Sequence, residues 1–171
     1  MPNSCAESIY ARSFFSFHNL PHKGEFDGQY FGLLGLDRGR YFNLHALEFY
    51  GQANFLKGGL VFSDAITTVS RRYSQEIQTK EFGCGLEGVL KERVQVLYGI
   101  INGLDYELWN PETDNLLKFN YNRHQLEGKW KNKELLQKEN GLVVDRKIPL
   151  MGLVTRLADQ KGLDITSQVM E

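Results

Sequence analysis

The sequence predicts an α/β fold organised around a parallel β-sheet. Short apolar runs, rich in β-branched or aromatic residues, alternate with segments whose apolar residues recur every three or four positions. Glycine, proline and asparagine mark the loops between them. This alternation is typical of strand–helix–strand units. The 171 residues, with 42% hydrophobic and 24% charged side chains, fit a globular chain of about one domain.

The first expected strand is the run SFFSF at 13–17, and Pro21 and Gly24 mark the loop that follows it. Residues 52–63 have apolar side chains at helical spacing, which predicts a helix. Residues 65–70 are β-branched and predict the second strand.

Ser70 is a candidate N-cap for a short helix over 71–77, because its hydroxyl can accept a bond from a free amide of the first turn. Residues 86–94 show helical spacing again. The run VLYGII at 96–101 predicts the third strand, which an Asn-Gly turn at 102–103 ends.

The last part of the chain begins with a charged surface helix expected over 123–139, which an Asn-Gly pair stops. Residues 141–147 are polar and predict a linker. The run IPLMGLV at 148–154 predicts a new strand, followed by a turn and the beginning of a helix. We therefore expect one domain portion at 1–147 and the start of another at 148–171.

Composition excludes several classes of protein. The net charge of −1 implies no bulk attraction to nucleic acid or to an anionic membrane. No apolar run is long enough to span a bilayer, and the start, MPNSCAESIYARS, does not have the pattern of a secretory signal. Cys5 and Cys84 lie far apart in no metal-ligand pattern, which favours two reduced thiols in a cytosolic protein.

The glycine-rich stretch GCGLEG at 83–88 matches the G-x-G-x-x-G pattern of dinucleotide-binding loops. Such a fingerprint must follow a strand, however, and the preceding residues EIQTKEF are polar and helical in character. The pattern therefore favours a flexible glycine loop that leads into a helix.

His18 and His22 are four residues apart, a spacing that can bind zinc on a helix. Pro21 lies between them and no glutamate follows the first histidine, so a metal site is disfavoured. His18 alone lies at the end of a predicted strand, with Asn19 next to it. Ligands of open α/β sheets bind at such strand ends. The alternative is a histidine that only bonds a neighbouring loop.

Two further groups of charged residues have both a functional and an ordinary interpretation. The segment NGLDYELWNPETD at 102–114 could provide a hydrolase carboxylate pair, or its carboxylates could simply be solvated. Arg156 and Lys161, in a turn before a helix, could bind an anion such as phosphate, or could be two surface cations.

Five stretches taken together resemble one enzyme family, the ADP-glucose-dependent glycogen and starch synthases of bacteria and plants. They occur in the family's order and spacing from about residue 10 to residue 164. The stretches are FFSFHNLPHKGEF (14–26), LEFYGQANFLKGGLVFSDAITTVS (47–70), EIQTKEFGCGLEGVL (76–90), GIINGLDYELWNPETD (99–114) and GLVTRLADQKGLD (152–164).

The resemblance implies a glycosyltransferase of the GT-B type, in which two Rossmann-like domains face each other across a cleft. The donor lies mainly on the C-terminal domain and the glucan acceptor on the N-terminal one. Such an enzyme moves glucose from ADP-glucose to the 4-hydroxyl at the non-reducing end of an α-1,4-glucan, with retention of configuration. It needs no metal or other cofactor, and works in the cytoplasm, or in the plastid stroma of a plant or alga.

The resemblance also assigns roles to single residues. Arg156 and Lys161 match the pair that holds the donor's diphosphate, where fixed cations stabilise the charge that grows on the leaving ADP. His18 matches the active-site histidine that contacts the transferred glucose. Asn102 matches an asparagine that lines the cleft, and Asn19, next to His18, is expected to bind substrate as well.

The sequence also departs from the family pattern. The family's N-terminal Lys-x-Gly-Gly loop and its C-terminal paired glutamates are absent, and most of the adenosine pocket is expected beyond residue 171. VSRRYS at 69–74 replaces the usual VSPTYA, and LPHKGEF at 20–26 replaces LAYQGVF. We therefore expect an internal piece of a synthase, inactive alone. The alternatives are a shortened glucan-binding homologue without catalysis, or a related transferase that uses UDP-glucose.

Overall fold

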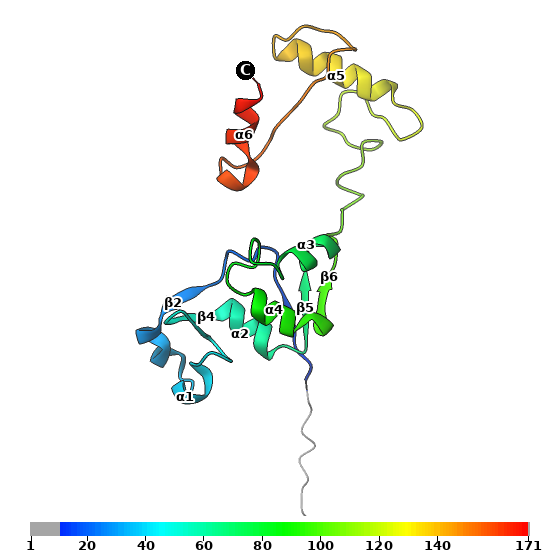
Figure 1. The fold of residues 1–171 in the computed structure, drawn as a ribbon. Coiled ribbons are helices and arrows are strands. Elements are labelled where there is room, and N and C mark those ends of the chain that lie inside the picture. The colour runs from blue at the N-terminus through cyan, green and yellow to red at the C-terminus, as the bar shows by residue number, and fades with distance from the viewer. Residues whose placement is uncertain (1–10, 171) are drawn as a thin grey trace, which may run out of the picture. The chain divides into compact units, whose positions relative to one another are not determined.

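The computed structural model describes residues 11–170, which form two compact units (Figure 1). The boundary between the units in the sequence lies after Gly103. The first unit contains a parallel sheet with helices, and the second is built around one helix of 13 residues. The domain boundary expected between residues 147 and 148 stays a prediction.

Most of the regular structure belongs to the first unit. In chain order its elements are β1 (Phe14–Ser16), β2 (Glu25–Asp27), the 3-10 helix η1 (Gly28–Leu34), α1 (Arg38–Tyr41), β3 (Glu48–Phe49), β4 (Gln52–Asn54), α2 (Phe55–Phe62), β5 (Ala65–Thr68), α3 (Arg71–Glu76), α4 (Glu87–Glu92), η2 (Val94–Val96) and β6 (Leu97–Gly99). The second unit has α5 (Glu127–Glu139), η3 (Asp159–Lys161) and α6 (Leu163–Gln168).

The central sheet has the order β1-β5-β6, and both pairings are parallel. Ile66 in β5 lies opposite Phe15 in β1 and opposite Leu97 in β6. Helix α2 connects β1 to β5, and α3 and α4 connect β5 to β6. The predicted α/β fold with a parallel sheet is therefore confirmed, with strands somewhat shorter than expected.

The main core lies between this sheet and helices α2 and α4, which are neighbours (Figure 1). Leu56 and Leu60 of α2 and Leu90 of α4 are almost completely buried, as is Ile66 of β5. Burying such side chains contributes about 1.5–3 kcal/mol each and is the main term that stabilises the unit.

The start of α3 agrees with the local sequence signal and lies close to the end of β6. The Ser70 hydroxyl accepts a hydrogen bond from the amide of Tyr73 at 2.9 Å, so Ser70 caps α3 as predicted. Gly99, at the end of β6, lies so close to the backbone of Ser70 and Arg71 that a Cβ atom would overlap it. Only glycine therefore lets β6 pass the beginning of α3.

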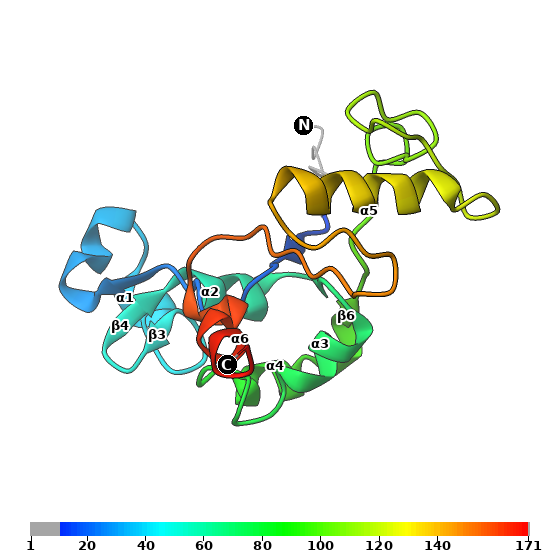
Figure 2. The same cartoon turned by 90° about the horizontal axis from the view of Figure 1, so that it is seen from above.

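A second sheet, antiparallel and in the order β2-β4-β3, was not predicted (Figure 2). It includes residues 52–54, which we had expected to be helical. The helix begins at Phe55 instead, because the Asn54 side chain accepts a bond from the amide of Lys57 at 2.7 Å and caps it. Phe31, Leu47 and other apolar residues form a small separate core beside this sheet.

Lys57 connects the second sheet to α2. Its side chain is 5% exposed, and its Nζ donates to the carbonyl oxygens of Leu44 at 2.7 Å and Glu48 at 2.6 Å. Burial lowers the pKa of Lys57, and the charge of Glu48 opposes that shift. A buried ammonium group bonded in this way holds the loop before β3 against the helix.

In the second unit, the long helix is shorter than predicted and the expected strand does not form. Helix α5 begins at Glu127, because the residues before it form a turn in which Asn122 pairs with Gln125. The prediction of a strand over 148–154 is wrong, since this segment is coil and Val154 is fully exposed. A strand needs a neighbouring strand as hydrogen-bonding partner, and no strand among residues 11–170 pairs with this segment. The expected helix after it is α6.

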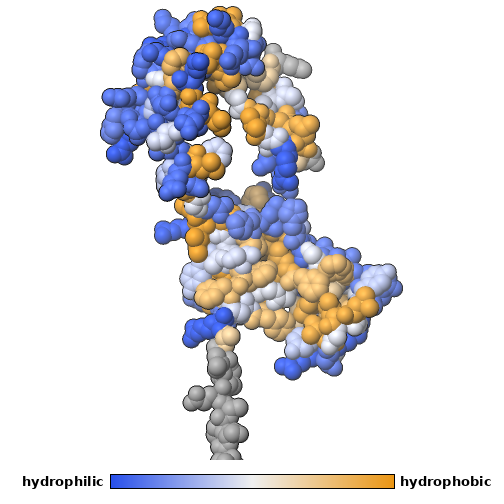
Figure 3. Space-filling view, turned by 180° about the vertical axis from the view of Figure 1, so that it is seen from behind, coloured by the Kyte–Doolittle hydropathy of each residue, from blue (hydrophilic) through white to orange (hydrophobic). Residues whose placement is uncertain are grey.

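Large apolar side chains are exposed on both units, and Figure 3 shows them as orange surface. Phe14 of β1 and Ile101 after β6 are examples in the first unit, and Met151 and Leu157 in the second. Within the described residues, β1 and β6 each pair on one side only, with β5. No helix in the described part of the chain is long and apolar enough to cross a membrane.

Of the two cysteines expected to be reduced thiols, the structure describes Cys84. Cys84 is a free, partly buried thiol at a position with a φ of 51°. Cys5 lies outside the described residues.

A substitution at Gly59 would test the packing of α2 against β1. A Cβ atom at Gly59 would overlap the ring of Phe15, so we expect Gly59→Ala to lower the free energy of unfolding by about 1–3 kcal/mol. Gly88, in α4, has open space around its Cα, so Gly88→Ala should be neutral or stabilising by up to about 1 kcal/mol. Urea unfolding of both variants measures the difference. Equal effects would contradict the described packing.

Asp64 predicts a pH dependence of stability. The amide and hydroxyl of Ser13, at 2.7 and 3.0 Å, hold the pKa of Asp64 below its ordinary value, and the charges of Arg12 and Arg93 act in the same direction. Because the pKa of Asp64 is lower in the folded than in the unfolded protein, its ionised carboxylate stabilises the fold at a pH above the unfolded pKa. This contribution is lost as the pH falls through the folded pKa.

We therefore expect the stability difference between the wild type and Asp64→Asn to shrink as the pH falls from about 6 to about 3. Urea unfolding across this range measures it. Glu81→Gln is the control, because Glu81 is exposed and makes no side-chain hydrogen bond within the described residues. A difference that is independent of pH would show that Asp64 has no such role.

Candidate functional site

The carboxyl ends of the three parallel strands surround a hollow of about 250 Å³, here called the strand-end hollow. Its lining residues come from the end of each strand and the loop after it: Ser16, Phe17, His18, Thr67, Thr68, Val69, Ile100, Ile101, Asn102 and Gly103. His18 and Asn102, far apart in the sequence, therefore line the same hollow. Ligands bind at this edge of open α/β sheets.

Backbone hydrogen bonds extend the sheet up to both residues. The amide of Phe17, next to His18, donates to the carbonyl of Thr67 at 3.1 Å. On the other side of β5, the amide of Ile100 donates to the carbonyl of Thr68 at 2.7 Å. Because β5 holds both neighbouring strands, it fixes the spacing between the backbones that carry His18 and Asn102.

His18 also borders a second hollow, of about 440 Å³, whose wall includes Asn19, His22, Lys23 and Phe55. We call it the loop hollow, since the loop over 18–24 forms one side of it. His18 and the adjacent Asn19 therefore both line this hollow, and the role of Asn19 in binding substrate stays a prediction. Among the described residues, no group of three His, Cys, Asp or Glu side chains could hold a metal ion.

The loop over 18–24 is held at three points. Leu20 is completely buried, and its amide donates to the Tyr73 hydroxyl at 3.1 Å. The amides of Phe55 and Leu56 donate to the carbonyls of Gly24 and Lys23 at 3.1 and 3.0 Å. The first amides of α2 thus bond the loop, which satisfies groups that have no partner within the helix.

The charged residues that distinguish this loop from the usual LAYQGVF pattern pair with each other. Lys23 Nζ lies 3.4 Å from Glu25 Oε1 and 4.6 Å from the centre of the Phe49 ring. The lysine that replaces a glutamine is therefore neutralised by the glutamate that replaces a valine. The loop hollow gains no free positive charge from Lys23.

The glycine-rich stretch 83–88 leads into α4, as predicted, but the residues directly before it form turns and not the helix that their sequence suggested. Gly85 has a φ of 83°, a conformation that favours glycine, while Leu86 is completely buried in the core. The loop borders another hollow, of about 700 Å³, together with Glu48, Lys57 and Arg93. Because no strand precedes it, the loop lacks the context of a dinucleotide fingerprint.

Two of the four carboxylates over 105–114 bond backbone amides close to them in the sequence, and Glu112 accepts a bond from the Asn122 side chain at 2.9 Å. Asp105 accepts bonds from the amides of Glu107 and Leu108, both at 3.0 Å, and Asp114 accepts one from Leu116 at 2.8 Å. Such side-chain bonds to the backbone stabilise turns. The geometry favours the ordinary interpretation of this acidic segment over a hydrolase pair.

Arg156 and Lys161 belong to the second unit and are both exposed. They lie on either side of a tight turn, in which Ala158 donates to the Arg156 carbonyl at 3.0 Å and Lys161 donates to the Ala158 carbonyl at 2.9 Å. Gly162, with a φ of 63°, then leads into α6. The role of this pair as a diphosphate site stays a prediction.

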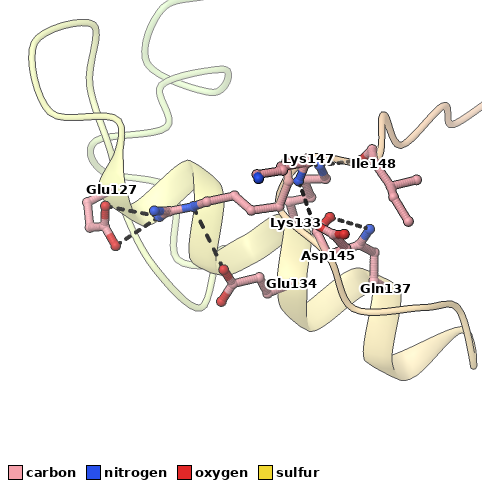
Figure 4. A network of polar contacts seen from close by, with 8 residues as sticks. Glu127, Lys133, Glu134, Gln137, Asp145, Lys147 and Ile148 are labelled. Carbon is pink, nitrogen blue, oxygen red and sulfur yellow. Dashed lines mark hydrogen bonds and ion pairs between the residues drawn. The ribbon is translucent and has the colours of Figure 1, made fainter.

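Side chains of helix α5 form hydrogen bonds with the segment 145–148, which precedes Arg156 in the sequence (Figure 4). The Arg146 guanidinium donates to both carboxylate oxygens of Glu127 at 3.1 Å and lies 3.8 Å from Glu134. It also lies over the Trp130 ring, 5.4 Å from its centre. Both hydrogen bonds to Glu127 come from one guanidinium nitrogen, Nη2, and the opposite charges of the partners strengthen them.

Two more side chains of α5 complete this contact, which we call the α5 clasp. Lys133 Nζ donates to the carbonyl oxygens of Arg146, at 2.8 Å, and of Ile148. Gln137, almost completely buried, donates to the carbonyl of Asp145 at 3.1 Å. The clasp was not predicted, because a lysine that bonds backbone carbonyls has no distinctive sequence pattern.

We expect Lys133→Met to loosen the segment after α5, since two carbonyl oxygens would lose their donor. Limited proteolysis should then cut within residues 141–156 several-fold faster than in the wild type. Lys138→Met, on the same helix, is the control, because Lys138 is exposed and its ammonium group has no partner in the described residues. Identical cleavage rates for the three proteins would argue against the clasp.

A family model described as "Starch synthase catalytic domain" matches residues 3–92, more than half of the chain. Among solved structures, the chain resembles the catalytic domain of starch synthase IV from Arabidopsis thaliana, bound to ADP and acarbose. The TM-score is 0.84 and the identity 36%, over 94% of this chain and 33% of that one.

Curated relatives agree with the family match. The chain is 49% identical to a glycogen synthase of Thermosipho melanesiensis, over 96% of this chain and 34% of the relative. It is 52% identical to a glycogen synthase of Thermotoga maritima, over 91% and 32%. The chain thus spans about a third of the length of these relatives. It belongs to the starch synthase catalytic domain family.

Proposed function

We propose that the protein carrying this sequence is a glycogen or starch synthase, which transfers glucose from ADP-glucose to an α-1,4-glucan. The observation that carries the proposal is the strand-end hollow, which His18 and Asn102 share. The family resemblance assigns both residues to the active site. The names of the relatives support the reaction class, and the Arabidopsis structure, bound to ADP and acarbose, supports the two ligand classes.

The proposed reaction exchanges one bond at the anomeric carbon for another. The bond between glucose C1 and the diphosphate oxygen breaks, and ADP leaves with the electron pair. A bond forms between C1 and O4 of the acceptor's non-reducing end, whose hydroxyl proton is released, and the configuration at C1 is retained. The proposed reaction uses no metal or other cofactor.

His18, Asn19 and Asn102 would bind the sugar substrates. All three side chains carry hydrogen-bonding groups, and His18 and Asn102 are exposed where the strands end. His18 would contact the transferred glucose as it takes on oxocarbenium character. Preorganised polar groups at such a point stabilise the transition state more than the ground state.

Arg156 and Lys161 would bind the donor's diphosphate. Arginine can bond two phosphate oxygens at once, and lysine adds a point charge. Both cations are solvent-exposed, and neither forms an ion pair within the described residues. They would stabilise the negative charge that grows on the leaving ADP.

We expect Arg156→Ala, made in the natural polypeptide, to lower kcat for transfer from ADP-glucose to glycogen roughly a hundredfold or more. Arg72→Ala is the matched control, because Arg72 is an exposed arginine whose one ion-pair partner among the described residues is Glu76, one helical turn away. Radiolabelled glucose incorporation measures both rates, and the same assay with UDP-glucose tests the donor. Full activity of Arg156→Ala would overturn its assignment.

The second candidate is a glucan-binding homologue without catalysis, which the exposed rings of Tyr106 and Trp109 favour. Retention on amylose beads without any glucosyl transfer, by the polypeptide isolated from its own cells, would support this candidate. Its intact mass, compared with the 19.7 kDa of this chain, shows whether the cell uses the sequence as part of a longer enzyme.

A further inference from the structure

The loop hollow and the strand-end hollow meet at one place. Both are lined by Ser16, Phe17 and His18, so His18 lies on the border between them. A ligand in the loop hollow would therefore end next to His18 without filling the strand-end hollow. The proposed reaction uses the strand-end hollow and, from the wall of the loop hollow, His18 and Asn19. The aromatic part of that wall has no role in it.

The wall of the loop hollow includes an exposed aromatic side chain. Phe55 is 41% exposed, although it is the first residue of α2 and follows the completely buried Asn54. Its ring contacts the Phe26 ring edge to face, with the centroids 5.2 Å apart and the planes at 74°. This contact supports one side of the Phe55 ring.

The backbone that carries Phe55 is rigidly placed. Its amide donates to the Gly24 carbonyl, and the Asn54 side chain caps the helix immediately before it. Gly24 has a φ of 62°, and a Cβ atom there would lie 3.6 Å from the Phe55 Cβ. These contacts place the backbone and the Cβ atom of Phe55 beside the loop that carries His18.

The charges around this hollow favour a neutral ligand over an anion. Lys23 is paired with Glu25 and packed on Phe49, so its charge is already compensated. Asn19 and His22 offer hydrogen-bonding groups beside the aromatic wall. A pyranose ring has an apolar C–H face and polar hydroxyl edges, which suit an aromatic face and adjacent polar groups.

We propose that Phe55 is a specificity-determining residue that stacks on a glucose unit at the non-reducing end of the acceptor glucan. The acceptor would occupy the loop hollow, and its terminal 4-hydroxyl would point to the border at His18. This inference rests on the proposed glucosyl transfer, since that reaction requires an acceptor end beside the transferred glucose. Phe55 itself does not touch the breaking bond.

The test is Phe55→Ala in the natural polypeptide. We expect the KM for maltoheptaose to rise roughly tenfold, which corresponds to the loss of one aromatic stacking contact. The KM for ADP-glucose should stay unchanged. Phe62→Ala is the matched control: Phe62 lies at the other end of α2, is 54% exposed, and contacts Tyr41 instead. It should leave both constants unchanged.

Two further variants separate stacking from folding. Phe55→Tyr keeps the aromatic face and should keep the low KM, whereas Phe55→Leu keeps apolar bulk without a ring and should behave like alanine. The thermal midpoint of each variant shows whether it is folded. An unchanged KM for maltoheptaose in Phe55→Leu, or an equal rise in Phe62→Ala, would overturn the proposal.

Binding of maltoheptaose without donor, measured by calorimetry, separates this inference from the proposed function. If the wild type transfers no glucose but Phe55→Leu still binds maltoheptaose roughly tenfold more weakly, the enzyme function fails and the glucan site stands. If the wild type transfers glucose and Phe55→Leu binds maltoheptaose as well as the wild type does, the site fails and the enzyme function stands.

Discussion

The parallel pairing of β1 and β6 with the shared strand β5 is the constraint on which the candidate site depends. Parallel strands present their carboxyl ends at one edge of the sheet, and each crossover returns the chain to the opposite edge. His18 and Asn102 follow two strands that are not paired with each other, and β5 lies between these strands. The core beneath, made by α2 and α4 against β5, keeps these three strands in register because any shift would open buried apolar contacts.

The loop after β1 shows how the fold turns a strand end into a binding surface. Its backbone carbonyls satisfy the first amides of α2, and its buried Leu20 is fixed to Tyr73 of α3. A loop attached to both helices can present His18 to two hollows without moving. The substituted charges of the loop, Lys23 and Glu25, compensate each other, so the change in sequence leaves the charge of the site unaltered.

The second unit is organised by side chains of one helix, not by a sheet. In the α5 clasp, Lys133 bonds the carbonyl oxygens of residues 13 and 15 positions further along the chain. Arg146, in that later segment, bonds Glu127 in the first turn of α5. These bonds supply the order that a strand ladder would otherwise give to residues 145–148. The turn that carries Arg156 and Lys161 follows, held by short backbone bonds of its own.

Local patterns in the sequence correctly predicted the parallel strands, the Ser70 cap and the turn at Gly141. The ordered motifs correctly predicted the family. These features depend on neighbouring residues, so a window of the sequence contains their cause. The tertiary structure alone decided the antiparallel sheet, the α5 clasp and the absence of a strand at 148–154. It also decided that the hollows beside His18 meet, and that Phe55 stands at one of them. Each of these depends on which distant backbone groups find a hydrogen-bonding partner, and no local pattern of residues specifies that.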